Sequence, residues 1–218
     1  MPTILLDMDE VLVDFIGGAC QVFDITRQQL EEARPNNQWD IVSVIGCCIQ
    51  TNLTIEAFWE EIHGYGKDFW IDLKPLPWAE ELMSLIRETT DSWYIVSAPS
   101  NCHSSYTGKI KWLKNYFGKE FDKFVLTPHK HLLAKSDRLL IDDRLENVCG
   151  FLHNGGNALL FASTGNKLYP YADDPVRHLS DSLDEIWKYI KALEGVGQPK
   201  QKYDGGARSE TNRMAGLL

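Results

Sequence analysis

The stretch Thr3-Ile4-Leu5-Leu6-Asp7-Met8-Asp9-Glu10-Val11 decides the fold of this chain. It begins with a short run of strand-forming, mostly apolar residues and passes directly into two aspartates separated by a single methionine. Such a run is typical of a strand buried on both faces of a parallel sheet, and sheets of this kind bind ligands at the carboxyl ends of their strands. The stretch therefore predicts a first strand that ends at a functional site.

Further apolar runs, each bounded by polar or turn residues, extend this pattern along the chain. They are Trp93-Tyr94-Ile95-Val96, Phe124-Val125-Leu126, Leu139-Leu140-Ile141 and Ala158-Leu159-Leu160-Phe161. Residues 79–89 and 109–117 lie between them and carry apolar side chains at helical spacing. Alternating strands and helices predict an α/β fold, with a Rossmann-like parallel sheet flanked by helices on both faces.

Residues 15–77 interrupt the alternation, because they hold helical patterns and no convincing strand. They end in Lys74-Pro75-Leu76-Pro77, where the two prolines exclude a continuous helix. We interpret this segment as a small helical cap inserted after the first strand, and residues 1–14 and 78–194 as the catalytic core. Residues 195–218 have hardly any apolar side chains before the end of the chain, which predicts a flexible polar tail.

Composition excludes several classes of function. A length of 218 residues with 44 % hydrophobic side chains suits one compact domain with an insertion. The net charge of −9 argues against binding of polymeric nucleic acid, which needs clustered cations, but permits a small phosphorylated ligand. No stretch is long and apolar enough for a membrane span, and the five cysteines have no metal or disulfide spacing. We therefore expect a cytoplasmic protein.

The expected strand ends bring chemically active residues to one edge of the sheet. In chain order they present Asp7-Met8-Asp9, Ser97-Ala98-Pro99, Thr127-Pro128-His129-Lys130 and Asp142-Asp143. Two carboxylates just beyond a buried strand, with two more on a neighbouring strand end, suit a hard cation with few protein ligands. We expect Mg²⁺ as the cofactor; its candidate ligands are Asp7, Asp9, Asp142 and Asp143, with Asp143 preferred in the last pair.

The same residues meet the needs of phosphate-monoester hydrolysis, which requires a nucleophile, a proton donor and neutralisation of the phosphate oxygens. Asp7 would attack phosphorus and form an aspartyl-phosphate. Asp9 would protonate the leaving oxygen and then activate water. Ser97, the backbone amides that follow it and a lysine would hold the remaining oxygens.

These four motifs resemble the signature of the haloacid dehalogenase (HAD) superfamily over residues 3–193. A narrower resemblance is to the 5'(3')-deoxyribonucleotidases. It is carried by Asp14-Phe15-Ile16-Gly17-Gly18, Asp68-Phe69-Trp70-Ile71-Asp72-Leu73-Lys74-Pro75-Leu76-Pro77, Leu126-Thr127-Pro128-His129-Lys130 and Leu139-Leu140-Ile141-Asp142-Asp143-Arg144. The resemblance implies a nucleoside monophosphate substrate. It also implies that Phe15, Phe69 and Trp70 of the cap sandwich the base.

Three positions depart from that family's pattern. Ala98 stands where a second hydroxyl residue is usual, within the expected substrate site. Glu10 replaces a common glycine and would alter access or charge at the mouth of the cap. Lys130 lies two residues farther along than expected, and Lys135 competes with it for the role of phosphate-binding lysine; the spacing from Leu126-Thr127 favours Lys130.

Other readings remain open at this level. Asp142-Asp143 taken alone fits an ordinary helix cap, and Phe69 and Trp70 taken alone fit cap-to-core packing. The rival functions are a phosphatase for another small phosphoester, such as a sugar phosphate or a polynucleotide end, and a nucleotide-binding protein without catalysis. The base, the sugar, the position of the phosphate and the oligomeric state, with a homodimer as one alternative, are left undecided.

Overall fold

The computed structural model describes residues 2–33 and 40–163, together with Ile186 and Lys188. The strands are β1 Thr3–Leu6, β2 Trp93–Ser97, β3 Phe124–Leu126, β4 Arg138–Asp142 and β5 Asn157–Leu160. The helices are α1 Phe15–Val22, α2 Arg27–Glu32, α3 Ile41–Cys48, α4 Ile55–Gly64, α5 Gly66–Ile71, α6 Ala79–Thr89, α7 His103–Phe117, the short 3₁₀ helix η1 Lys130–Leu133 and α8 Leu145–His153.

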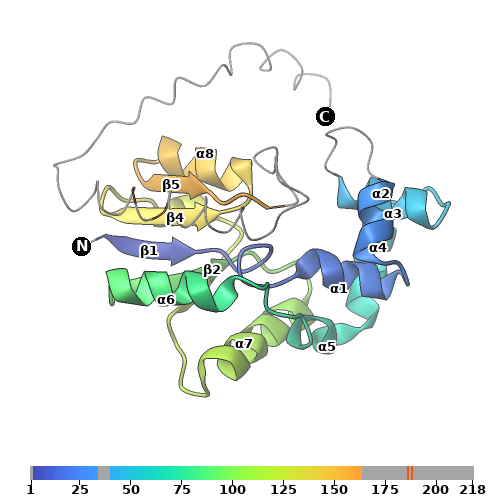
Figure 1. The fold of residues 1–218 in the computed structure, drawn as a ribbon, viewed down its shortest axis with the longest axis horizontal. Coiled ribbons are helices and arrows are strands. Elements are labelled where there is room, and N and C mark those ends of the chain that lie inside the picture. The colour runs from blue at the N-terminus through green and yellow to red at the C-terminus, as the bar shows by residue number, and fades with distance from the viewer. Residues whose placement is uncertain (1, 34–39, 164–185, 187, 189–218) are drawn as a thin grey trace, which may run out of the picture.

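The strands form one parallel sheet in the order β3-β2-β1-β4-β5 (Figure 1). β1 lies at its centre, and Leu6 pairs with Ile95 of β2 on one side and Ile141 of β4 on the other. The chain proceeds from β1 to β2 and β3 in one direction and then crosses to β4 and β5 in the other. The carboxyl ends of β1, β2 and β4 therefore meet at a topological switch point, which is where such sheets bind ligands. The predicted α/β sheet is confirmed.

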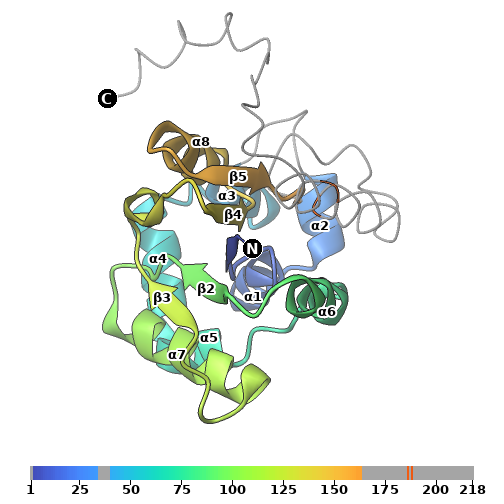
Figure 2. The same ribbon diagram turned by 90° about the vertical axis from the view of Figure 1, so that its left-hand side faces the viewer.

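Two apolar layers cover the sheet, because alternate strand residues face opposite sides. Ile4 and Leu6 pack with α6 and α7 in the larger core cluster, whereas Leu5 and Leu140 pack with Val148 of α8 in a smaller one. Figure 2 shows α6 and α7 on one face and α8 on the other. The strands read as nearly continuous apolar runs because both faces are buried.

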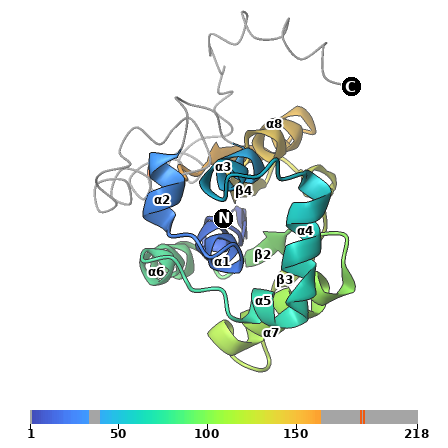
Figure 3. The ribbon, with the colours of Figure 1, turned by 90° about the vertical axis from the view of Figure 1, so that its right-hand side faces the viewer.

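The helices α1 to α5 lie beyond the carboxyl edge of the sheet, and α1 to α4 stand in front of it in Figure 3. The chain leaves and re-enters the core side by side. The Asp14 N–H donates to the Lys74 carbonyl at 2.9 Å, and the Leu76 N–H donates to the Leu12 carbonyl at 2.8 Å. These two hydrogen-bonded segments lie close to residues 15 and 77, which we interpret as the boundaries of the cap.

Helix α5 packs closely on α7, and Gly108 makes the approach possible. A Cβ atom added at Gly108 would lie 2.4 Å from Cβ of Trp70 and 2.7 Å from the Lys67 carbonyl oxygen. Only a residue without a side chain fits between these helices. Helix α5, the last helix before the chain returns to the core, is therefore packed directly against the core helix α7.

The predicted elements match the structure with one notable difference. Helix α6 has the predicted bounds, but α7 begins at His103, six residues before the expected start at 109. Residues 103–108, which form the additional first turns of α7, are mostly polar and end in Gly108, so they show no helical spacing of apolar side chains. The predicted tail, residues 195–218, lies outside the described residues. In the described part of the chain, no helix has the length and apolar character of a membrane span.

Candidate active site

Asp7 directly follows β1 and is only 4 % exposed. Its N–H donates to the Ile141 carbonyl of β4 at 2.9 Å, which fixes its backbone at the switch point. Its Oδ1 accepts from the Met8 N–H at 2.7 Å and lies 2.6 Å from Lys130 Nζ. Among the described residues no hydrogen bond reaches Oδ2. That oxygen has the freedom that a nucleophile or a metal ligand needs.

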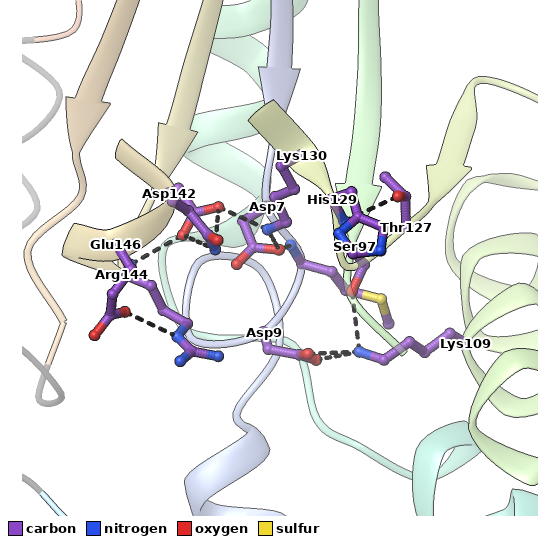
Figure 4. A network of polar contacts seen from close by, with 12 residues as sticks. Asp7, Asp9, Ser97, Lys109, Thr127, His129, Lys130, Asp142, Arg144 and Glu146 are labelled. Carbon is purple, nitrogen blue, oxygen red and sulfur yellow. Dashed lines mark hydrogen bonds and ion pairs between the residues drawn. The ribbon is translucent and has the colours of Figure 1, made fainter. Parts of the chain in front are cut away.

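Lys130, the first residue of η1, lies in the centre of the site with 2 % exposure. Its Nζ is 2.6 Å from both Asp7 Oδ1 and Asp142 Oδ2 (Figure 4). Burial lowers the pKa of this lysine, but the two carboxylates outweigh burial and raise its pKa above the ordinary value. Lys135 is exposed beyond the end of η1. Of the two candidate lysines, the structure brings Lys130 to the carboxylates.

Asp7, Asp142 and Asp143 present carboxylate oxygens within 4.8 Å of one another. Burial raises the pKa of Asp7 to about 7, partly opposed by Lys130 and reinforced by Asp142. The pKa of Asp143 is raised well above its usual range, mainly by burial and then by Asp7. Three crowded carboxylates at low exposure fit a divalent cation, whose charge offsets their mutual repulsion.

The two aspartates at the carboxyl end of β4, Asp142 and Asp143, differ in their contacts. Asp142 is fully buried and accepts hydrogen bonds from Lys130, the Arg144 N–H at 2.9 Å and Asn147 Nδ2 at 3.0 Å. Asp143 accepts from Ser163 Oγ at 3.0 Å and is half-buried. The oxygens of Asp142 are therefore engaged in holding the strand end and Lys130. This favours Asp143 as the direct metal ligand.

The Asp9 carboxylate points away from this group of aspartates and toward α7 (Figure 4). Lys109 Nζ lies 2.6 Å from its Oδ1 and 2.5 Å from its Oδ2, and it also donates to Ser97 Oγ at 3.0 Å. Both Lys109 and Ser97 are fully buried, whereas the Asp9 side chain is 27 % exposed. The structure thus joins two of the predicted site residues through a lysine that the sequence analysis did not select.

The sequence contains a sign that Lys109 is buried and paired. It lies three and four residues before Trp112 and Leu113 on one helical stripe, and both of these side chains are buried. A lysine on the apolar stripe of a helix is expected to have a buried partner, since an unpaired buried ammonium is costly. The apolar period of residues 109–117 predicts a helix but does not by itself distinguish Lys109 from the other lysines on it.

Glu10, which stands where a glycine is common in the resembling family, adopts a left-handed backbone conformation with φ of 56°. Glycine avoids the cost of this conformation, which is about 1–2 kcal/mol for other residues. The buried Glu10 side chain accepts from the Ile16 N–H at 2.8 Å and lies 3.3 Å from Arg27 of α2, which also pairs with Asp14. Burial raises the pKa of Glu10 to about 7, although Arg27 opposes the shift. Glu10 therefore links the catalytic loop to the first two cap helices.

The three cap aromatics pack against one another. Phe15 stacks on Trp70 with ring centroids 5.8 Å apart, and Phe69 meets Trp70 edge-on at 4.9 Å. Trp70 is 1 % exposed and Phe69 7 %, while Phe15 is half-buried. Lys109 Nζ lies 4.8 Å from the Trp70 ring centroid. A base would have to separate these rings to enter between them, so the predicted sandwich is closed in this structure.

Phe15 also begins a row of half-buried aromatic rings that runs through Trp59 to His63. Its ring lies 6.0 Å from that of Trp59, which stacks on His63 at 5.6 Å, and His63 Nε2 is 3.0 Å from Ser100 Oγ in the loop after β2. The cap therefore meets the core close to the strand end that carries Ser97. Ala98 is half-buried in the same loop and supplies no hydroxyl group there.

Comparison with known proteins identifies the family of this chain. The profile of the family described as 5' nucleotidase, deoxy (pyrimidine), cytosolic type C protein (NT5C) matches residues 1–177. A mouse mitochondrial 5'(3')-deoxyribonucleotidase is 32 % identical over 197 residues, which cover 86 % of this chain and 84 % of the mouse protein. Its human counterpart is 31 % identical over 199 residues, covering 86 % and 81 %.

A solved structure supports the fold independently of sequence. A HAD family hydrolase from Deinococcus radiodurans, with bound phosphate and sodium, superimposes with a TM-score of 0.53 at 14 % identity, over 89 % of this chain and 96 % of that protein. At this identity the likeness concerns the fold alone. The family profile and the two relatives establish that the chain belongs to the cytosolic type C deoxynucleotidase family, whose members are phosphoric monoester hydrolases.

Proposed function

We propose that this protein hydrolyses nucleoside monophosphates, with deoxyribonucleotides preferred, through an aspartyl-phosphate at Asp7. The observation that carries the proposal is the position of Asp7. It is buried at the central strand end, has Lys130 at 2.6 Å, and lies among further aspartates within 4.8 Å. The mouse and human relatives are named as 5'(3')-deoxyribonucleotidases, which supports the choice of substrate.

The first half of the reaction transfers the phosphoryl group to the enzyme. Oδ2 of Asp7 attacks phosphorus as the bond from phosphorus to the sugar oxygen breaks, and Asp9 gives a proton to that oxygen so that the nucleoside leaves as a neutral alcohol. Lys130, Ser97 and the backbone amides that follow Ser97 hold the charge of the non-bridging oxygens.

The second half returns the enzyme to its starting state. Asp9, now a carboxylate, takes a proton from a water molecule that attacks the same phosphorus atom. The bond from phosphorus to Asp7 breaks, inorganic phosphate leaves, and Asp7 is again a carboxylate. A residue that acts first as an acid and then as a base has to remain in one place through both halves.

Mg²⁺ is the cofactor that best suits the aspartates at these strand ends. Asp7, Asp143 and the backbone carbonyl of Asp9 would hold it, with Asp142 beside them. A bound Mg²⁺ supplies positive charge to the phosphate oxygens and keeps nearby carboxylates ionised. This fit rests on three low-exposure carboxyl groups, two of which have raised pKa values.

The cap is proposed to select nucleotides through its aromatic side chains. Stacking on an aromatic face contributes roughly 1–3 kcal/mol per base in other nucleotide-binding sites. Phe15 is the half-buried ring of the three predicted residues, and its ring centroid lies 5.8 Å from that of Phe69 and 5.8 Å from that of Trp70. Phe15→Ala is therefore the sharpest test of base stacking, because it removes the least buried contact of the cluster.

Substitution of the proposed nucleophile tests the chemistry. Asp7→Asn is expected to abolish phosphate release with Mg²⁺ present and to leave the circular dichroism spectrum unchanged. Asp122→Asn, at an exposed position just before β3, is the matched control and is expected to keep the wild-type rate. More than a few per cent of wild-type turnover in Asp7→Asn would contradict the phospho-enzyme.

A substrate panel tests the specificity. Phosphate release is measured with and without Mg²⁺ on 5'- and 3'-monophosphates of ribo- and deoxyribonucleosides, and on a sugar phosphate. We expect the deoxyribonucleotides to have the highest kcat/KM. Phe15→Ala should lower kcat/KM on these nucleotides and leave hydrolysis of an aryl phosphate unchanged. Equal rates on the sugar phosphate would exclude base recognition by the cap.

A further inference from the structure

The site contains two buried lysines, and each serves a different catalytic aspartate. Lys130 contacts Asp7 and Asp142, whereas Lys109 contacts Asp9 and Ser97 (Figure 4). We propose that Lys109 is a positioning residue that holds the Asp9 carboxylate where it exchanges a proton with the leaving oxygen. This inference rests on the proposed function, since it gives Lys109 a role in the acid–base step of that reaction.

The contacts of Lys109 fix the Asp9 side chain in both position and direction. Both carboxylate oxygens lie within 2.6 Å of the same Nζ atom, so rotation about either side-chain bond of Asp9 breaks at least one contact. At 27 % exposure the Asp9 side chain would otherwise sample several rotamers. A catalytic group misplaced by about 1 Å can cost roughly 100-fold in rate. A contact that fixes the position of the Asp9 carboxylate would therefore preserve the rate of proton transfer.

Lys109 is itself immobilised on every side that the structure describes. Its ammonium donates to Ser97 Oγ at 3.0 Å and lies 4.8 Å from the Trp70 ring centroid, and the whole side chain is inaccessible to solvent. Gly108, the preceding residue, is the point of closest approach between α7 and α5. Lys109, the anchor of Asp9, thus lies next to the close contact between α7 and α5.

A packing role alone does not account for a lysine at this position. An ammonium group taken out of water costs several kcal/mol unless it is paired, and apolar side chains of similar volume often replace buried ion pairs without loss of stability. An unbranched apolar residue would fill the space beside Trp70. The ion pair with Asp9 is the contact that such a residue could not make.

The proposal predicts an effect that depends on the leaving group. A nucleoside leaves as an aliphatic alkoxide, which needs a proton as the bond to phosphorus breaks, whereas 4-nitrophenolate is a stable anion and needs little help from an acid. Loss of the anchor should therefore lower kcat/KM, which reports the phosphoryl-transfer half, much more for a nucleoside monophosphate than for 4-nitrophenyl phosphate. The water-activation half is common to both substrates and affects only kcat. A lysine that only packed, or only bound phosphate, would affect both substrates alike.

The experiment compares kcat and KM for both substrates in wild type, Lys109→Met, Lys109→Arg and Asp9→Asn, with Mg²⁺ present. Lys111→Met is the matched control, because Lys111 is exposed on the same helix. In Lys109→Met we expect kcat/KM on the nucleotide to fall about 10- to 100-fold, in line with a misplaced acid. The value of kcat/KM on 4-nitrophenyl phosphate should change less than about threefold, and Lys109→Arg should recover part of the lost kcat/KM because it keeps a cation.

Several outcomes would overturn the proposal. Equal losses on the two substrates would leave Lys109 with a packing role, and a raised KM with weaker inhibition by inorganic phosphate would make it a phosphate ligand. Thermal melts verify folding, and Lys109→Gln, which is polar and close in length, replaces Lys109→Met if the latter unfolds. If Asp9→Asn slows both substrates equally, Asp9 is not the general acid and the proposed function is wrong in that step. If Asp9→Asn slows the nucleotide more than 4-nitrophenyl phosphate and the Lys109 variants do not, only the positioning role of Lys109 is wrong.

Discussion

Replacement of Lys130 by methionine should destabilise the metal-free protein strongly at pH 8 and less at pH 5.5. Methionine keeps the length and the apolar stem of the side chain and removes only its charge and its donors. The change leaves Asp7 and Asp142 without the cation that lies 2.6 Å from each of them, and Asp143 remains beside them. Crowded carboxylates must then either repel one another or take up protons.

The size of the effect follows from these distances. At 2.6 Å each contact corresponds to about 6 kcal/mol of attraction at an effective dielectric constant of about 20, and much of this is offset by desolvation of the three groups. Removal of one partner from a buried ion pair typically costs about 3–5 kcal/mol, because a charge remains buried without compensation. We expect a loss in this range at pH 8.

The loss should be smaller at low pH, as the direction of the pKa shift shows. Asp7 has a pKa of about 7 with Lys130 present, and Lys130 lowers it, so removal of the lysine moves the pKa of Asp7 further up. At pH 5.5 Asp7 is therefore protonated in the variant, and the repulsion is relieved. Added Mg²⁺ should also restore part of the stability at pH 8, because a divalent cation replaces the missing charge.

Urea denaturation in EDTA at both pH values measures the effect. Lys135→Met is the control, because this exposed lysine was the alternative candidate, and surface substitutions of this kind usually change stability by less than about 0.5 kcal/mol. A loss below about 1 kcal/mol at pH 8 for Lys130→Met would refute the reasoning. An equal loss at both pH values would show that the carboxylates do not respond to the lysine.

Two further substitutions test the cap. The folded pKa of Glu10, about 7, lies above its ordinary value of 4.5, so the stability that this group contributes is fully present below pH 4.5 and is lost as pH rises through 7. Glu10→Gln should therefore gain about 3 kcal/mol relative to wild type between pH 4.5 and 8 in urea titrations, and a constant difference would contradict this. Gly108→Ala should lower the melting temperature by several degrees, since its Cβ would meet Trp70 at 2.4 Å, whereas Gly64→Ala, with nothing within 4 Å, should not.

The sequence predicted the sheet and the carboxylate site because both depend on local signals. Apolar runs that end in Asp7 and Asp142 identify buried strands and their ends together, and parallel strands then bring those residues to one edge. The choice between Lys130 and Lys135 needed the structure, because the turn of η1 decides which side chain enters the core. Lys109 needed the contact between helices as well, since its partner Asp9 is 100 residues away in the chain.

The cap aromatics show a different limit. Phe69 and Trp70 look alike in a sequence whether they face a ligand or one another, because both arrangements bury a large apolar area. The Nε1 atom of Trp70 is buried and has no hydrogen-bond partner among the residues that the structure describes. Neither this feature nor the contact between Trp70 and Lys109 can be derived from composition or periodicity.

The two segments that connect core and cap restrict how the cap can move. Near Val13 and Pro75 they run antiparallel and share hydrogen bonds, so they form a two-stranded ribbon and not two independent linkers. The shared hydrogen bonds couple the two segments so that they move together, and the close packing of α5 against Gly108 restricts that movement. A substrate would therefore enter through movements of individual side chains and of α1 to α4, and the seat of α5 would act as the fixed pivot.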